Sequence, residues 1–425
     1  MVIIKKYSTS LTDNRFGKWG WSIIIYVMIL NFFYAALTTD GQNLFPNFFA
    51  QVNGWNPNAL LAVATPAGII GIIGNFVFSR MVIKIKAKTI AGVTMIVTGI
   101  CFAILGFAPN VPVYFVAMCL VCFFAAGFGL SAQPVFMAHW FPKKKGIALG
   151  WSTMGAPFSS AFFVSGFSVL FGMAGLQKSF LVIGIIVVIM GIISFFWAKD
   201  YPEEVGAYPD NMVPDETEAQ EVNDATEEKS QFTLGALMRD KDMWLIAIGF
   251  GLMWMTLVGI LSQFVPRMMS VGYEQSQALM MLTVVSIIAI PGSYFWGWLD
   301  SKIGTKKASF IFAFSYVFAL VCLIASTNAV VVWIGCICAG FGIGGLLNLL
   351  TSMVISVYGR KDFVFANSVI VPIASILRVL AFLLVAVLLQ VSQGSYTLPY
   401  VVFIVIDIIG AVLILLVTNK CKGRN

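Results

Sequence analysis

The chain has 425 residues, of which 59% are hydrophobic and 11% charged, with a formal net charge of +7. Soluble domains carry about 25% charged residues, so this composition excludes an ordinary soluble enzyme or binding module. A bilayer needs about 20 consecutive apolar residues for each helical crossing. Stretches of that length recur along almost the whole chain, which predicts an all-α polytopic membrane protein.

Apolar runs between charged breaks predict twelve transmembrane helices. The residues before Trp19 lack the layout of a cleaved signal peptide, so we expect the first span to be retained. The predicted spans are 19–43, 58–79, 89–108, 112–138, 147–171, 179–198, 243–265, 275–299, 308–326, 329–357, 364–391 and 397–418.

Basic residues are distributed unevenly between the predicted loops. If both termini lie on one side, 23 of the 26 basic residues fall on that side. The other side receives only Lys178 and Arg267, and Arg378 is left inside a span. This asymmetry follows the positive-inside rule, so we expect a multi-pass protein of the plasma (inner) membrane with both termini cytoplasmic.

The chain divides into two similar halves. Residues 200–242 hold 13 of the 19 acidic residues and separate six spans from six. "AGFGL" (126–130) recurs as "AGFGI" (339–343) at a six-span offset, and such repeats are typical of duplicated transporters with a midplane site. We therefore predict an N-terminal six-helix bundle (1–198), a solvated acidic cytoplasmic linker (199–242) and a C-terminal six-helix bundle (243–425).

No pattern predicts an enzyme or a cofactor. "GFGIGG" (340–345) fits a dinucleotide-binding pattern but lies inside a membrane helix without a preceding strand. A Walker A motif is absent, and the single histidine has no nucleophile beside it. The basic loops indicate contact with an anionic leaflet of the lipid bilayer, and we expect no nucleic acid partner.

Several loops resemble those of a known superfamily. "GWLDSKIGTKK" (297–307) resembles the loop after span 8 of the major facilitator superfamily, although Asp300 sits one place early. By this resemblance Arg80, Asp300, Lys302 and Gly304 belong to gating loops. "HWFPKKKGIALGW" (139–151) and "YPEEVGAYPD" (201–210) resemble the oxalate:formate antiporter and monocarboxylate transporter group.

The resemblance implies two six-helix bundles that alternate access to a central cavity, and a carboxylate substrate. The group's span 11 lysine would fall near Ala374, one turn before Arg378. Its span 8 arginine has no counterpart between Gln275 and Leu299. These two departures argue against oxalate and favour a monoanion, which needs a single cationic partner.

Arg378 lies near the middle of its span, where a charge costs about 2.5–3.5 kcal/mol on insertion scales. Its planar guanidinium can bind a carboxylate through two parallel hydrogen bonds. We interpret Arg378 as an anion clamp. The alternative is a structural ion pair with Asp407 in span 12.

Asp40 follows a polar string in span 1, near the expected outer edge of the membrane. It is either a titrating carboxylate for proton coupling or a solvated helix end. Superfamily position assigns further polar or aromatic side chains to the central cavity as substrate-binding candidates. They are Asn31, Tyr34, Gln133, Trp254, Ser286 and Asn348.

The sequence thus predicts a secondary active transporter of a small organic anion, in particular a monocarboxylate, acting as a monomer by proton symport or anion exchange. One alternative is a carrier of a zwitterion or a larger conjugated acid. The alternative of another class is a membrane sensor or receptor that signals without transport.

Overall fold

A computed structural model describes residues 11–56, 59–60, 63–213, 232–325, 328–418 and 421–422. Every regular element in these ranges is a helix. Eleven helical segments of the described chain are long and apolar enough to cross a membrane. One of them, Ala329–Val391, contains both predicted spans 10 and 11, so twelve crossings are consistent with the structure.

The first half contains predicted spans 1 to 6. Span 1 consists of α1 (Gly17–Ala35), η1 (Ala36–Asp40) and α2 (Gly41–Asn53), and spans 2 and 3 are α4 (Ala64–Val82) and α5 (Ala87–Leu105). Span 4 consists of α6 (Val111–Ala126), η2 (Gly127–Ala132) and α7 (Gln133–Trp140). Span 5 consists of α8 (Lys145–Thr153), α9 (Gly155–Phe158), η3 (Ser159–Phe163) and α10 (Val164–Ala174), and span 6 is α11 (Leu176–Trp197).

The second half begins with the short helix α13 (Leu234–Met238) and contains spans 7 to 12. These are α14 (Lys241–Ser262) with α15 (Phe264–Val271), α16 (Gln275–Ile303), α17 (Thr305–Ala325), α18 (Ala329–Ile343), α19 (Gly345–Val391) and α20 (Thr397–Leu415). Within α19 the backbone leaves the helical conformation at Gly359, where φ is +69° and glycine is favoured. This break separates span 10 from span 11.

Span 1 is longer than the sequence predicted. The helix passes through the π-helical turn η1 and ends at Asn53, not at residue 43. The predicted start of span 2 at residue 58 lies outside the described residues, and α4 begins at Ala64. Pro46 lies inside α2 without ending it. A proline removes one backbone donor, and membrane helices tolerate this loss where neighbouring groups satisfy the freed carbonyl.

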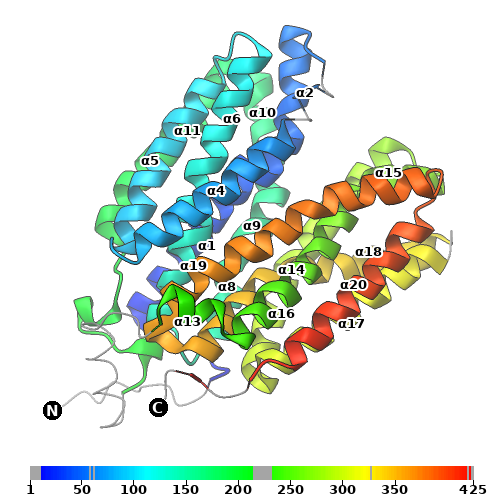
Figure 1. Cartoon of the computed structure of the whole chain (residues 1–425). Coiled ribbons are helices and arrows are strands. Elements are labelled where there is room, and N and C mark those ends of the chain that lie inside the picture. Colours follow the sequence, from blue (N-terminus) through cyan, green and yellow to red (C-terminus); the bar gives the residue numbers. More distant parts are fainter. Residues whose placement is uncertain are drawn as a thin grey trace.

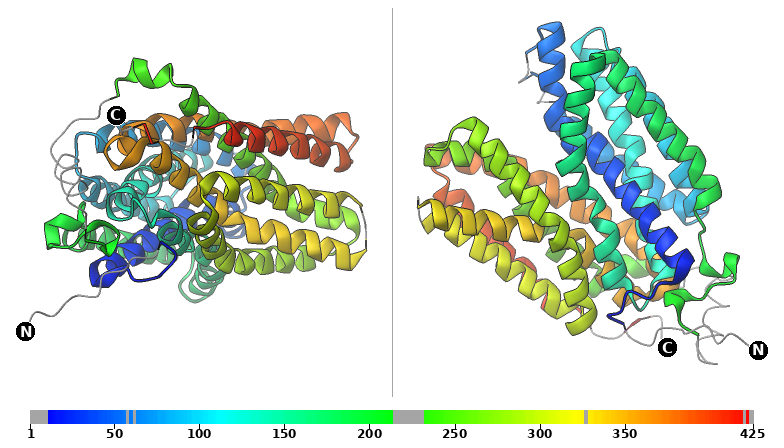
Figure 2. Two further views of the ribbon diagram at one scale, coloured as in Figure 1. Left: turned by 90° about the horizontal axis from the view of Figure 1, so that it is seen from below. Right: turned by 180° about the vertical axis from the view of Figure 1, so that it is seen from behind.

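The two bundles meet at one end and diverge toward the other, as Figure 1 and the right view of Figure 2 show. We call the shared end, where residues 11–16 and 421–422 lie, the terminal end, and the opposite one the far end. Bundle-to-bundle packing involves α8 and α9 against α16, and α4 and α7 against α19. A Cβ added to Gly297 would lie 2.2 Å from the Gly146 carbonyl oxygen, so small residues permit this approach.

Burial along span 5 shows the same divergence. Residues 146–150 of α8 are all buried, whereas Phe167 is the one buried residue of α10, and Met173 is 83% exposed. The bundles are therefore packed tightly toward the terminal end and separate toward the far end.

The acidic segment after span 6 is more ordered than a solvated linker. Its described part, 200–213, forms two short 3-10 turns, η4 (Pro202–Val205) and η5 (Pro209–Asn211), and buries Pro202, Pro209 and Asp210. Residues 214–231 lie outside the described part of the chain. The first third of the predicted linker is thus packed against the N-terminal bundle.

Candidate functional site

Three predicted site residues from different helices meet around one positive charge. The Arg378 Cζ of α19 lies 4.9 Å from the ring centroid of Trp254 in α14. The guanidinium is also within hydrogen-bonding reach of the Tyr34 hydroxyl in α1. Tyr34 belongs to the first bundle, and Trp254 and Arg378 to the second. The charge therefore lies where the two halves face each other.

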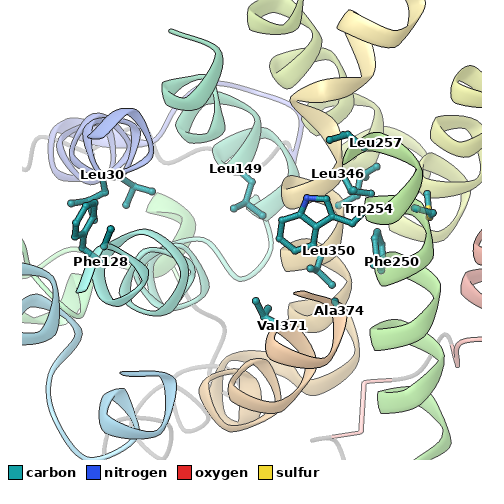
Figure 3. Packing of buried hydrophobic residues seen from close by; sticks show 14 of the residues in the cluster. Leu30, Phe128, Leu149, Phe250, Trp254, Leu257, Leu346, Leu350, Val371 and Ala374 are labelled. Atoms are coloured by element: carbon teal, nitrogen blue, oxygen red, sulfur yellow. The ribbon is translucent and has the colours of Figure 1, made fainter. Parts of the chain in front are cut away.

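Close packing of α14 on α19 brings Trp254 and Arg378 together. A Cβ added to Gly251 would lie 3.2 Å from the Cα of Ala374, so the helices approach closely at this level. Trp254 is three residues after Gly251, and Arg378 is four residues after Ala374. Because these spacings preserve a helix face, both side chains project from the same contact. Figure 3 shows the Trp254 ring of α14 next to Leu346 and Leu350 of α19.

The alternative pairing of Arg378 with Asp407 is not formed. Asp407 in α20 is 1% exposed, and neither carboxylate oxygen has a hydrogen-bond partner within the described part of the chain. Its electrostatic neighbour is Tyr316 of α17. Over the same residues, no ion pair joins Arg378 to any carboxylate. The partly exposed guanidinium is thus free of a protein anion.

Span 4 fixes Tyr34 and brings in two residues that the sequence analysis missed. A Cβ added to Gly129 would lie 2.3 Å from the Tyr34 ring, so only glycine allows this contact. Seven residues before Gly129 in the same span, Cys122 accepts a hydrogen bond from Gln42 Nε2 at 3.1 Å and lies within electrostatic range of Arg378. Cys122 had the pattern of a packing cysteine, and the sequence contains no signal that would have distinguished it.

Asp40 belongs to a separate polar contact. Ser159 and Ser160 donate to its two carboxylate oxygens at 2.6 and 2.8 Å. These partners lie in η3, so two π-helical turns face each other. The helix continues beyond Asp40 to Asn53, which rules out a solvated helix end. Asp40 is six residues beyond Tyr34, about 9 Å toward the far end.

The remaining candidates have different environments. Asn31 donates to the carbonyls of Val27 and Ser152, and so ties span 1 to span 5. Ser286 donates to Leu282 in its own helix. Asn348 donates to the Ser293 carbonyl, while its Oδ1 lacks a partner among the described residues. Gln133 is fully buried, and neither of its amide atoms has a partner in that part of the chain.

Comparison with known families identifies the fold. The profile of the Major Facilitator Superfamily matches residues 19–382, which includes the helices that carry Tyr34, Trp254 and Arg378. The chain belongs to this superfamily. It is therefore a membrane transporter by family, and its two bundles are the two halves of the major facilitator fold.

Individual relatives of this superfamily member are distant. It is 21% identical over 362 residues to the uncharacterized MFS-type transporter YhjX of Escherichia coli (strain K12), covering 83% of this chain and 84% of the relative. A structure of the proton:xylose symporter XylE superposes with a TM-score of 0.73 at 13% identity, covering 95% of this chain and 97% of that one. The human organic anion transporter MFSD10 (TETRAN) has a TM-score of 0.73 at 9% identity, with coverages of 93% and 99%.

The four residues assigned to gating loops by resemblance lie at the terminal end of this major facilitator protein. Asp300 is buried and accepts a hydrogen bond from Ser352 at 2.5 Å, and Lys302 lies over the Trp298 ring at 4.7 Å. Gly304 ends α16 with φ +87°. Arg80 stacks on Phe76 within the first bundle, 5.1 Å from the ring centroid. Asp300 also lies within 2.5 Å of a Cβ position on Gly146, directly at the bundle interface.

A bidentate ion pair joins the two halves at this end. Arg360 Nη1 and Nη2, between spans 10 and 11, lie 3.0 and 3.1 Å from the Glu203 carboxylate oxygens in η4. The guanidinium also lies 5.6 Å from the Tyr201 ring centroid, and that ring stacks on His139 of α7. Neither partner was predicted, because Glu203 sits in an acidic stretch that reads as solvated.

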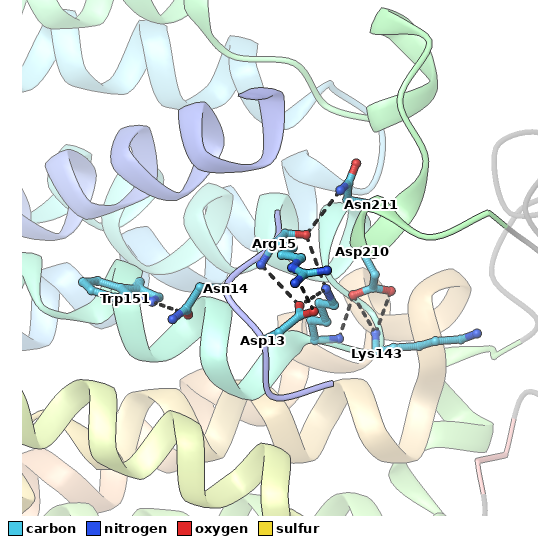
Figure 4. A network of polar contacts seen from close by, with 8 residues as sticks. Asp13, Asn14, Arg15, Lys143, Trp151, Asp210 and Asn211 are labelled. Carbon is cyan, nitrogen blue, oxygen red and sulfur yellow. Dashed lines mark hydrogen bonds and ion pairs between the residues drawn. The ribbon is translucent and has the colours of Figure 1, made fainter. Parts of the chain in front are cut away.

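The residues before span 1 form a second connection (Figure 4). Asn14 accepts a hydrogen bond from Trp151 of span 5 at 3.0 Å and donates to the Tyr294 hydroxyl of span 8 at 3.4 Å. Asp13 forms an ion pair with the fully buried Lys144 at 2.7 Å. The terminal end is therefore closed by polar contacts as well as by packing.

Asp210 organises the loop between spans 4 and 5. Its carboxylate accepts hydrogen bonds from the backbone nitrogens of Lys143 and Lys144 at 3.0 and 2.6 Å. Burial raises the pKa of this carboxyl to about 6, although both hydrogen bonds act in the opposite direction. The linker residue thus holds the loop that faces the second bundle.

Proposed function

We propose that this transporter carries a small organic anion of the monocarboxylate class, and that Arg378 binds its carboxylate. The observation that supports this most directly is a half-buried arginine inside a span, next to Trp254, with no carboxylate of the described residues paired to it. A charge in the membrane normally has a partner or faces a cavity. A carboxylate ligand would supply the missing partner through two charge-assisted hydrogen bonds.

The arrangement fits a carrier that alternates access between the two sides. Arg378 and Trp254 belong to the second bundle and Tyr34 to the first, so one small anion would contact both halves. Binding would offset the cost of the unpaired charge and favour closure of the bundles around the anion. The motifs at 139–151 and 201–210, which resemble the oxalate:formate and monocarboxylate transporter group, support a carboxylate substrate.

We assign the terminal end to the cytoplasm and the protein to the plasma membrane, because 23 of the 26 basic residues are expected on that side. The driving step is proton symport or anion exchange, with Asp40 as the coupling candidate. An imposed pH gradient separates the two, because symport requires the gradient and exchange requires a second anion on the opposite side.

Substrate counterflow in proteoliposomes tests the role of Arg378. We expect Arg378→Gln to lower the initial rate at least about 100-fold, the effect of losing a charged hydrogen-bonded pair of roughly 3 kcal/mol. Arg378→Lys should be intermediate, because an ammonium keeps the charge without the bidentate geometry. Lys178→Gln at the far end is the matched charge-removal control.

Unchanged counterflow in a folded Arg378→Gln protein would refute the assignment. A thermal-stabilisation panel of simple acids, zwitterions and conjugated acids addresses the alternative substrates, because a ligand stabilises the state that binds it. Binding without counterflow in the wild type would instead support a sensor or receptor.

A further inference from the structure

We propose that Gln133 is a specificity-determining residue that hydrogen-bonds a second polar group of the anion, and that it makes this contact only after the bundles move. The inference rests on the proposed carboxylate site at Arg378. It narrows the substrate class to monocarboxylates that carry a hydroxyl, oxo or amide substituent near the carboxylate.

The first observation is an amide without partners. Gln133 is 0% exposed, and neither Oε1 nor Nε2 is hydrogen-bonded within the described part of the chain. An amide offers two donor hydrogens and an acceptor oxygen, and leaving them unpaired in a buried place is costly. Other buried amides keep at least one hydrogen bond. Asn31 donates to two carbonyls, and the Asn75 Oδ1 accepts from Ser79 and Ser131, although the Asn75 Nδ2 has no partner among the described residues.

The second observation places this amide on the face of span 4 that lines the Arg378 site. Cys122 on that face contacts Gln42 of span 1, and Gly129, seven residues later, contacts the Tyr34 ring. Gln133 follows Gly129 by four residues, through a π-helical turn of about 4.4 residues, so it returns to the same face. It therefore lies about one turn, roughly 6 Å, closer to the terminal end than Tyr34.

The third observation concerns access. The α7 helix packs against both α1 and α19, the helices that carry Tyr34 and Arg378. Arg378 is half-buried in this conformation, whereas Gln133 is fully buried. An anion would thus meet the guanidinium first and the amide only when the bundles shift. The added hydrogen bonds would favour that shifted state and so couple selectivity to the conformational step.

The experiment compares acids that differ by one hydroxyl. Lactate and propionate, and glycolate and acetate, are used as competitors of counterflow with the wild type, Gln133→Met, Arg378→Gln and the exposed control Gln177→Met. Methionine keeps the length of glutamine and removes its hydrogen bonds. We expect the wild type and Gln177→Met to prefer each hydroxy acid about 10-fold to 100-fold. Gln133→Met should reduce that ratio to below about 3-fold by weakening the hydroxy acid alone.

The outcomes separate the two proposals. Equal inhibition by both members of each pair in the wild type, or a preserved ratio in Gln133→Met, would overturn the role of Gln133 while leaving Arg378 intact. If neither acid of a pair inhibits counterflow in Arg378→Gln, the carboxylate site at Arg378 is supported. If no acid competes with the wild type, or if Arg378→Gln binds all acids normally, the proposed function fails and this inference fails with it. Should Gln133→Met not fold, equal inhibition by both acids of each pair in the wild type would still overturn the role of Gln133.

Discussion

Arg378 shows how one charge is accommodated within an apolar span. Its guanidinium lies over the face of the Trp254 indole and within reach of the Tyr34 hydroxyl. A cation over an aromatic ring gains about 0.5–2 kcal/mol, which is less than the cost of the charge in the membrane. The protein contacts therefore orient the guanidinium without neutralising it.

Replacement of Trp254 tests this orienting role. We expect Trp254→Leu to raise the half-saturation concentration of counterflow about 3-fold to 30-fold, since the guanidinium loses its fixed plane. Trp254→Phe keeps a ring and should fall between the wild type and leucine. The concentration dependence of counterflow measures the effect. An identical half-saturation in wild type and Trp254→Leu would show that the ring does not orient Arg378.

The contact between Gly129 and Tyr34 makes a second prediction. An added methyl at Gly129 would overlap the Tyr34 ring, because its Cβ would lie 2.3 Å from the ring carbons, far inside van der Waals contact. Overpacking typically costs about 1–3 kcal/mol, so Gly129→Ala should melt earlier and transport poorly. In the double variant Gly129→Ala/Tyr34→Ala the melting penalty should shrink, since the clash is removed. Additive penalties in thermal unfolding would contradict a direct contact.

At the scale of elements, the two π-helical turns η1 and η3 create a polar pocket for Asp40. A π turn widens the helix and redirects side chains, and such turns are frequent at functional sites. Here the turn places Asp40 opposite Ser159 and Ser160 instead of toward Arg378. Substrate binding and coupling would therefore use separate groups on neighbouring turns of span 1.

Asp40→Asn separates these roles. If Asp40 couples transport to protons, this variant should retain counterflow within about 3-fold and lose accumulation driven by a pH gradient, because the amide cannot titrate. Ser159→Ala/Ser160→Ala keeps the carboxylate but removes both donors, and we expect it to shift the pH dependence of uptake upward, since the ionised form is less stabilised. Equal loss of counterflow and accumulation in Asp40→Asn would place Asp40 in substrate binding instead.

The helices were largely predictable from the sequence, because apolar runs bounded by basic loops report membrane crossing directly. The side-chain contacts that the helices and the linker make were not predictable from the sequence. Hydropathy places Asp40 at a membrane edge, yet only the continued helix and the η3 turn show what the carboxylate contacts. Glu203 and Asp210 carry the same acidic signal as the rest of the linker, although they pack against particular loops. Arg378 could be singled out from the sequence, because the free-energy cost of a charge in a span depends on its depth in the membrane, which hydropathy alone indicates.

At the scale of the molecule, closure of the terminal end depends on a few contacts between the halves. Gly146 and Gly297 allow α8 and α16 to approach, while Arg360–Glu203 and Asn14 connect the bundles through polar groups. A carrier that alternates access must break these contacts in every cycle, so each can contribute only modestly to the stability of the closed state. The Arg360–Glu203 ion pair is expected to shift the equilibrium between the closed and open states the most, because the Arg360 side chain is only 9% exposed and that of Glu203 29%.

Glu203→Gln should therefore shift the protein toward a state open at the terminal end. Loss of a partly buried bidentate pair worth about 1–2 kcal/mol would move the equilibrium roughly 5-fold to 30-fold. Cysteine probes report the shift in a background without native cysteines. Ser301→Cys replaces a residue whose hydroxyl accepts a hydrogen bond from the Ile147 backbone of the other half, and it should react faster with a thiol reagent applied from the terminal side. Ser286→Cys, on the far half of α16, should react more slowly from the far side. Glu203→Arg/Arg360→Glu restores the pair with its charges exchanged and should return both rates toward the wild type. If Ser301→Cys reacts no faster in Glu203→Gln than in the wild type, the ion pair does not hold this end closed.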